Sequence, residues 1–191
     1  MKPFKVYINE KSPLYEIYQN ALEEELTKWA FSCIAEWTAA EKPHADALAK
    51  TGFWGKQGAG CIFYAQDTQK FLVAHRSRGV EQPNTWGTWG GAIDSGENPK
   101  DAVRREAEEE CGYSGKMELI PLFVFSHSSG FTYHNFLAVI PKEFTPRLDW
   151  ESQGFKWVSF GDWPTPLHPG LQKLLSDKHS VVRMQQVIKK P

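Results

Sequence analysis

Apolar side chains recur at intervals of three or four residues between Ser12 and Trp37. The positions are Leu14, Tyr18, Leu22, Leu26, Trp29, Cys33 and Trp37. This spacing predicts an amphipathic helix, for which Ser12 suits the N-cap and Pro13 the first helical position. We expect the apolar face to pack on the flank of a larger domain, because covering a core is the commonest use of such a face. The seam of a homodimer is the alternative.

Beyond residue 60, short apolar runs bounded by turn residues predict strands, and an apolar period of three to four residues predicts helices. Strands are expected at 61–65, 70–75, 86–93, 119–126, 133–140 and 154–160, with helices at 98–111 and from 171 onward. Residues 42–59 are expected to be a connector. Interleaved strands and helices indicate an α/β fold around one sheet. We expect an N-terminal helical arm in residues 1–50 and a domain in residues 51–191 that ends in a helix.

The composition is that of an ordinary folded protein of 191 residues, with 41% hydrophobic and 24% charged residues and a net charge of −1. Such a balance gives no general attraction to nucleic acid or to an anionic membrane. The three cysteines lie far apart and outside any metal-binding spacing, which predicts neither disulfides nor structural zinc. The sequence shows no signal-peptide core and no apolar run of membrane length, so we expect a cytoplasmic protein.

A glycine-rich loop leads into the most clearly bounded helix, at residues 98–111. Asn98 suits the N-cap, Pro99 the first helical position, and Gly112 the left-handed residue that closes the helix. Within the helix, Glu106, Glu109 and Glu110 occupy positions i, i+3 and i+4.

That spacing brings three carboxylates onto one helical face. Clustered negative charges repel unless something neutralises them, and a hard divalent cation such as Mg²⁺ prefers carboxylate oxygens and also binds phosphates. An ordinary solvated acidic face is the alternative.

The segment 91–113 resembles the signature of the Nudix hydrolase family, written G, five residues, E, seven residues, R-E-U-x-E-E-x-G-U, where U is a bulky apolar residue. Every fixed position is matched, by Gly91, Glu97, Arg105, Glu106, Glu109, Glu110 and Gly112. Ala107 and Tyr113 fill the two apolar positions, and Trp89 stands where proline often precedes the paired glycines. The resemblance implies a Nudix α/β/α sandwich around a mixed sheet, here with an N-terminal helical extension.

The resemblance also implies a metal site. In this family the signature glutamates hold divalent ions, often with the carbonyl of the first glycine. These positions correspond to Glu106, Glu109, Glu110 and Gly91. Mg²⁺ is the expected cofactor and Mn²⁺ the alternative.

Three further residues receive expected roles from their places in or near the signature. Arg105 and Glu97 are expected to orient the metal-binding carboxylates and the loop, although an ordinary surface ion pair is the alternative. Glu151, a late glutamate in a loop before a short strand, is the candidate general base, with a merely solvated carboxylate as the alternative.

The expected activity is hydrolysis of the pyrophosphate bond in a nucleoside diphosphate linked to another group. Nucleotide sugars such as ADP-ribose, dinucleotides and nucleoside triphosphates all fit, because the signature does not select among them. The partner is therefore a small nucleotide, with no membrane and with nucleic acid limited to RNA 5′ ends. Two alternatives are an inactive nucleotide-binding sensor of the same fold and an RNA 5′-end decapping hydrolase.

Overall fold

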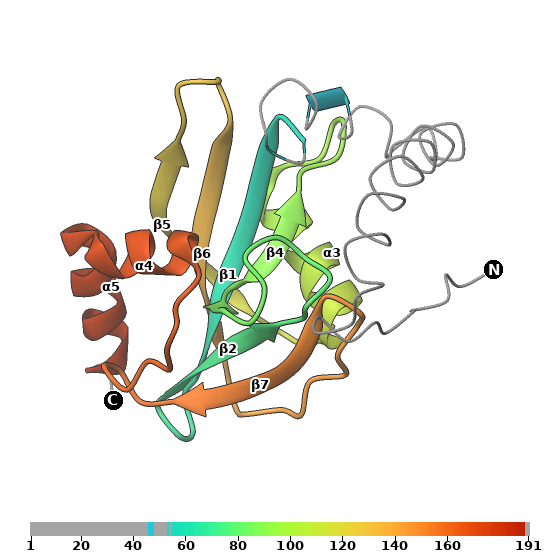
Figure 1. Ribbon diagram of the computed structural model, residues 1–191. Helices are drawn as coiled ribbons and strands as arrows, with labels where there is room; N and C mark the ends of the chain where they lie inside the picture. Colours follow the sequence, from blue (N-terminus) through green and yellow to red (C-terminus); the bar gives the residue numbers. More distant parts are fainter. Residues whose placement is uncertain (1–45, 48–52, 54, 190–191) are drawn as a thin grey trace, which may run out of the picture. The chain divides into compact units, whose positions relative to one another are not determined.

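Figure 1 shows the computed structural model, which describes residues 46–47, 53 and 55–189. These residues all belong to one compact unit, His44–Pro191. The helix expected at residues 12–37 lies outside them, as does the boundary at residue 50. The helical arm, its packing and the division of the chain therefore stay predictions.

The core of the unit is a mixed sheet with the strand order β3-β2-β1-β6-β5, in which β4 pairs with β1 and β7 pairs with β2. The strands are β1 (Gln57–Ala65), β2 (Lys70–Arg76), β3 (Trp86–Gly87), β4 (Trp89–Ala92), β5 (Glu118–Ser126), β6 (Thr132–Ile140) and β7 (Ser152–Val158). The neighbours β1 and β6 run parallel, and the other described pairs are antiparallel. The short β4 thus lies against the first half of β1, next to the loop that leads into the signature helix.

Helices cover both faces of this sheet: α3 (Pro99–Cys111) one face, and α4 (Pro169–Ser176) with α5 (Lys178–Ile188) the other (Figure 1). Side chains along β1 alternate between the two cores, as the period of a strand requires. Cys61 and Phe63 pack toward α3, whereas Ile62 and Tyr64 pack toward α4 and α5. The expected α/β/α sandwich around a mixed sheet is confirmed. No helix among the described residues combines the length and apolar character needed to cross a membrane.

The expectation of a connector up to residue 59 was wrong at its end, because β1 already begins at Gln57. Gly58 and Gly60 hide the start of this strand, since residues without side chains show no apolar alternation. Their lack of Cβ atoms has a structural reason. A Cβ on Gly58 would lie 2.6 Å from a ring carbon of Tyr133 and 3.0 Å from the Gly91 carbonyl oxygen.

Two other expected strands differ in detail. The single strand expected at 86–93 is two short strands, β3 and β4, separated at Thr88. Their partners explain the division, because β3 pairs with β2 and β4 pairs with β1. The strand expected at 154–160 runs instead from Ser152 to Val158, where its pairing with Phe71 of β2 ends.

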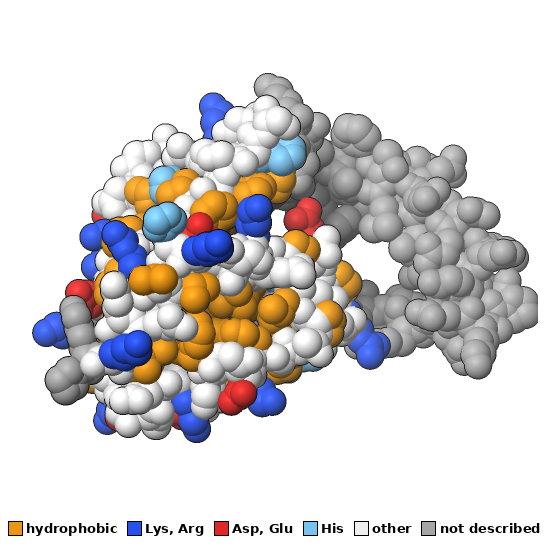
Figure 2. Space-filling model, turned by 90° about the vertical axis from the view of Figure 1, so that its left-hand side faces the viewer, with side chains coloured by type: hydrophobic (Ala, Val, Ile, Leu, Met, Phe, Trp, Pro, Cys, Tyr) orange, Lys and Arg blue, Asp and Glu red, His pale blue; other side chains and the backbone are white. Residues whose placement is uncertain are grey.

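Helix α5 covers part of the outer edge of β5. The Phe123 N–H donates to the Ser180 hydroxyl at 2.9 Å, and the Arg183 guanidinium donates to the Pro121 carbonyl. Beside these contacts lies a groove lined partly by Leu122 and Val182. Figure 2 shows hydrophobic side chains gathered on this face, with Lys and Arg side chains around them. Unpaired strand edges promote aggregation, and α5 protects this one.

Candidate functional site

The signature helix α3 is fixed at both ends by its own sequence. At the start, the Asn98 side-chain oxygen accepts hydrogen bonds from the backbone N–H groups of Lys100 and Asp101, at 3.0 and 3.1 Å. At the end, Gly112 has φ 72°, a left-handed conformation that suits glycine, and its N–H donates to the Glu108 carbonyl. Both expected caps are confirmed, so the glutamates of α3 stand on a helix with defined ends.

Arg105 connects this helix to the preceding loop, and all five of its N–H groups have an acceptor. Nε and one terminal nitrogen donate to the two carboxylate oxygens of Glu97, at 3.1 and 3.0 Å. The same terminal nitrogen donates to the Ala92 carbonyl at 2.8 Å, and the other donates to Glu106 at 2.8 Å and Glu109 at 3.1 Å. A planar guanidinium is the side chain that can bind so many acceptors at once.

Glu97 holds the loop as well as the arginine. Its Oε2 accepts a hydrogen bond from the backbone N–H of Asp94 at 3.0 Å. The side chains of Arg105 and Glu97 are 28% and 15% exposed, so this is not the freely solvated pair that usually contributes little. The contacts of these two residues join the loop at 92–97 to α3.

Two of the signature glutamates, Glu106 and Glu110, contact the paired glycines Gly90 and Gly91 of β4. The Gly90 N–H donates to Glu110 Oε2 at 2.8 Å. A Cβ on Gly91 would lie 2.6 Å from Glu106 Oε1, so a larger residue there would displace that carboxylate. The glycine-rich segment is therefore in contact with both carboxylates.

The carboxylates of Glu106, Glu110 and Glu151 form a cluster of like charge that is largely withdrawn from solvent, whereas the Glu109 side chain is exposed. Burial raises the pKa of Glu106 to about 7, although Arg105 opposes the shift. Burial also raises the pKa of Glu110, and the negative charges of Glu106 and Glu151 raise it further. Since these charges interact, Glu151 lies near the signature glutamates, and its role in the site stays a prediction. The cluster is electrostatically costly without a cation.

Glu151 reaches this position because its loop is attached to α3 and to the end of β2. The backbone N–H of Asp149 donates to the Glu110 carbonyl at 3.2 Å, and the N–H of Ser77 donates to the Glu151 carbonyl at 2.7 Å. Burial and the charge of Asp149 raise the pKa of Glu151, whereas Arg76 lowers it. Asp149 and Arg76 were missed in the sequence. Asp149 could have been noticed as a second carboxylate two residues before Glu151, but Arg76 carries no local signal.

The donor set fits a hard divalent cation. In the described part of the chain, no group of three or more His, Cys, Asp or Glu side chains is already arranged to hold a metal ion. Glu106 and Glu109 accept hydrogen bonds from Arg105, and Glu110 accepts one from Gly90. Even so, buried carboxylate oxygens of like charge beside a backbone segment are the chemistry that Mg²⁺ or Mn²⁺ prefers.

Comparison with known proteins agrees with this geometry. The family model of the NUDIX domain matches residues 55–178. The chain is 33% identical over 129 residues to a Mycobacterium tuberculosis protein named putative 8-oxo-dGTP diphosphatase 3, a match that covers 62% of this chain and 59% of that protein. It is 31% identical over 115 residues to the dihydroneopterin triphosphate diphosphatase of Haemophilus influenzae, a match that covers 51% of this chain and 70% of that protein.

A solved structure shows the same fold. A Nudix hydrolase from M. smegmatis superimposes with a TM-score of 0.57 and 27% identity, covering 71% of this chain and 87% of that one. The signature, the sandwich around a mixed sheet and the match over residues 55–178 agree with one another. The chain belongs to the NUDIX domain family.

Proposed function

We propose that this protein hydrolyses the pyrophosphate bond of a nucleoside diphosphate linked to another group, with a divalent metal ion as cofactor. The observation that carries the proposal is the contact of Glu106 and Glu110 with the Gly90–Gly91 segment, within a buried cluster of negative charge. Such a cluster becomes favourable when a cation and a phosphate bind beside it. NUDIX enzymes generally use divalent metals, and Mg²⁺ is the ion we expect here, with Mn²⁺ as the alternative.

Glu106, Glu109, Glu110 and the Gly91 carbonyl would hold this ion. When bound, the ion would neutralise charge on the diphosphate and make a water molecule a stronger nucleophile. Arg105 would orient the carboxylates, because its N–H groups already donate to Glu106 and Glu109. Metal ligands usually need such supporting contacts, and losing one commonly lowers activity about 10- to 100-fold.

Glu151 is the proposed general base. Its carboxylate interacts with those of Glu106 and Glu110, and its raised pKa brings it nearer to the range in which a base works at neutral pH. Glu151→Gln should lower kcat by about a hundredfold or more with little change in KM. A rate within about twofold of wild type at saturating Mg²⁺ and substrate would leave Glu151 without this role.

Among possible substrates, we propose triphosphates that carry a two-ring nitrogen base, such as purine nucleoside triphosphates, before nucleotide sugars and dinucleotides. The support is the names of the two relatives, which refer to 8-oxo-dGTP and to dihydroneopterin triphosphate. The chain spans 59% of the length of the first of these proteins, so its substrate has to be measured directly.

The test is a panel of triphosphates, ADP-ribose, NADH and capped RNA, each incubated with Mg²⁺ and followed by identification of both products. Cleavage between two phosphates of a small nucleotide is the expected result. Tight nucleotide binding with no cleavage of any compound would contradict the proposal and favour an inactive sensor. Cleavage of capped RNA alone would instead favour a decapping hydrolase.

A further inference from the structure

Tyr133 lies across the glycine positions of β1, on the face of the sheet opposite α3. In the parallel pairing of β1 with β6, Tyr133 is the partner of Gly58. A Cβ on Gly58 would lie 2.6 Å from a carbon of the Tyr133 ring, and a Cβ on Gly60 would overlap the Tyr133 hydroxyl. The ring therefore occupies the space that side chains at these two positions would fill, and its hydroxyl extends toward β4.

The hydroxyl reaches the first of the paired glycines in the candidate site. A Cβ on Gly90 would lie 2.8 Å from the Tyr133 hydroxyl oxygen. The Thr88 side chain, two residues earlier, lies near enough to the hydroxyl to lower its pKa. On its other side, Gly90 donates its N–H to Glu110 at 2.8 Å. The backbone of β1 lies closer still, because a Cβ on Gly90 would lie 2.3 Å from the Ala59 carbonyl oxygen and from the Gly60 Cα. Gly90 is thus confined by β1, by a tyrosine from β6 and by a glutamate from α3.

The need for such confinement follows from the backbone of Gly90. Its φ is 143°, a conformation that side-chain-bearing residues rarely adopt, and it is followed by a second glycine. A Gly-Gly segment has wide conformational freedom and loses much entropy when it is fixed. Contacts from outside the segment must therefore set the direction of the Gly90 N–H.

The electrostatics agree with this proximity. Burial raises the pKa of Tyr133, and the negative charges of Glu110 and Glu106 raise it further. A neutral hydroxyl is therefore favoured beside the carboxylates of α3.

We infer that Tyr133 is a positioning residue: its hydroxyl, packed against Gly60 and Gly90, holds the Gly90–Gly91 segment so that the Gly90 N–H and the Gly91 backbone face the carboxylates of α3. In this role Tyr133 acts through the Gly90–Gly91 segment. Removing the hydroxyl should loosen the Gly90 amide, weaken metal binding and slow turnover. Since the turnover readout rests on the proposed hydrolysis, the two other readouts are chosen to be independent of it.

The experiment compares wild type with Tyr133→Phe and Thr88→Val in the full chain. Tyr64→Phe is the matched control, because Tyr64 is a buried tyrosine of β1 in the core beside α4 and α5. Amide hydrogen exchange at Gly90 is measured by NMR, Mn²⁺ affinity by calorimetry, and kcat and KM with the best substrate of the panel. Thermal unfolding establishes that each variant is folded.

Tyr133→Phe and Thr88→Val are each expected to speed Gly90 exchange and weaken Mn²⁺ binding, by about tenfold or more. Turnover should fall by a similar factor with KM within about twofold. Combining the two changes should add little, because both act on the same contact between Tyr133 and Thr88. Tyr64→Phe should leave the Gly90 exchange rate as in wild type.

Wild-type exchange at Gly90 and wild-type Mn²⁺ affinity in folded Tyr133→Phe would overturn the inference, whatever the turnover. Equal effects from Tyr64→Phe would also overturn it, because they would show a general loss of stability. A wild-type protein that cleaves no substrate contradicts the proposed function instead, and the exchange and Mn²⁺ measurements still decide the role of Tyr133.

Discussion

Replacing Arg105 by methionine should destabilise the metal-free protein by about 3 kcal/mol. A hydrogen bond to a charged group contributes about 1.5–3 kcal/mol, and leaving a partly buried carboxylate without its partner adds to the loss. The contacts with Glu97 and Glu106 dominate, because the Arg105 side chain is 28% exposed and these two carboxylate side chains are only 15% and 13% exposed. The contact with Glu109 adds little, because that side chain is 58% exposed and screened by solvent.

Arg105→Lys should recover about a third of this loss, since it restores the positive charge without the planar fork that binds both oxygens of Glu97. The matched control is Arg104→Met, one residue earlier on α3. The Arg104 side chain is 50% exposed, and one of its terminal nitrogens lies 3.6 Å from a carboxylate oxygen of Asp101. Its removal should therefore change the free energy of unfolding by less than about 0.5 kcal/mol.

The assay is urea unfolding in EDTA at pH 7, with the three variants and wild type analysed at a common slope. A loss below about 1 kcal/mol for Arg105→Met would refute the stabilising role of Arg105, since it would mean that the Arg105–Glu97 ion pair behaves like a solvent-exposed one. A loss equal to that of Arg104→Met would refute it as well.

Three further predictions concern stability. Because the pKa of Glu106 is raised above its unfolded value to about 7, ionising it costs folded stability as pH rises from about 4.5 to 7. In urea unfolding with EDTA, the free energy of unfolding of Glu106→Gln relative to wild type should therefore rise by about 2 kcal/mol between pH 5 and pH 8. A difference that does not change with pH would contradict this. Gly60→Ala should lower the free energy of unfolding by about 2 kcal/mol, because the new methyl group would overlap the Tyr133 hydroxyl, whereas Gly79→Ala has open space and should cost far less. Equal melting temperatures of these two variants would rule out the overlap. Asn98→Ala should cost about 1 kcal/mol in the same assay by removing the N-cap of α3, and an unchanged midpoint would argue against that cap.

The sequence predicted the parts of the site that are built from neighbouring residues. The caps of α3 and the shared face of its glutamates depend on spacing along one helix, which can be counted from the sequence. Glu151 was proposed for the site only because similar proteins often carry a late glutamate there. Its placement depends on backbone hydrogen bonds to α3 and β2, which no local pattern encodes.

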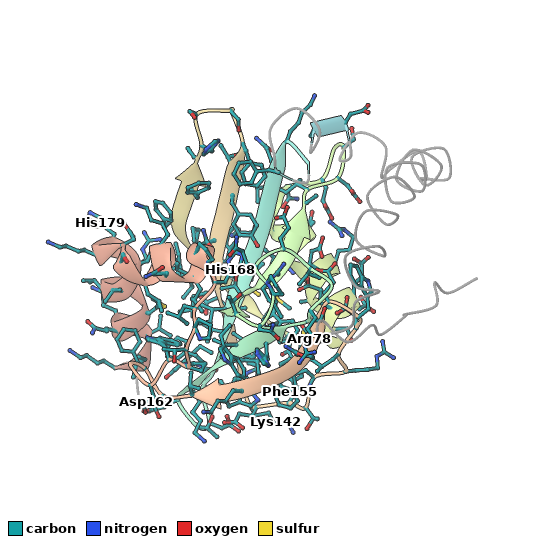
Figure 3. All side chains as sticks on the ribbon, in the orientation of Figure 1. Arg78, Lys142, Phe155, Asp162, His168 and His179 are labelled. Carbon is teal, nitrogen blue, oxygen red and sulfur yellow. The ribbon has the colours of Figure 1, made fainter. Side chains whose placement is uncertain are left out.

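Contacts between distant strands were the part that the sequence did not show. Gly58 and Gly60 were assigned to a connector. The side chain that requires glycine at both positions is the Tyr133 ring of β6, more than seventy residues later in the sequence. Arg76 ends an unremarkable strand, yet its charge acts on two distant residues. Burial lowers the pKa of His168 and Arg76 lowers it further, whereas at Glu151 Arg76 opposes the rise in pKa that burial and Asp149 cause. His168 marks the start of α4, whereas His179 lies on the outer side of α5 (Figure 3). Pairings of this kind become visible only when the sheet is assembled.

The central claim is that the carboxylates of α3 form the metal site of a pyrophosphohydrolase. The variant Glu110→Gln tests this claim most directly. Its control is Glu108→Gln, since Glu108 is exposed on the same helix and is not among the signature glutamates. Hydrolysis is measured at saturating substrate with Mg²⁺ and again in EDTA, after thermal unfolding has established that both variants are folded. We predict that Glu110→Gln lowers kcat by about a hundredfold or more, that Glu108→Gln stays within about twofold of wild type, and that EDTA abolishes turnover of wild type. Full activity of wild type in EDTA, or of folded Glu110→Gln with Mg²⁺, would contradict the account.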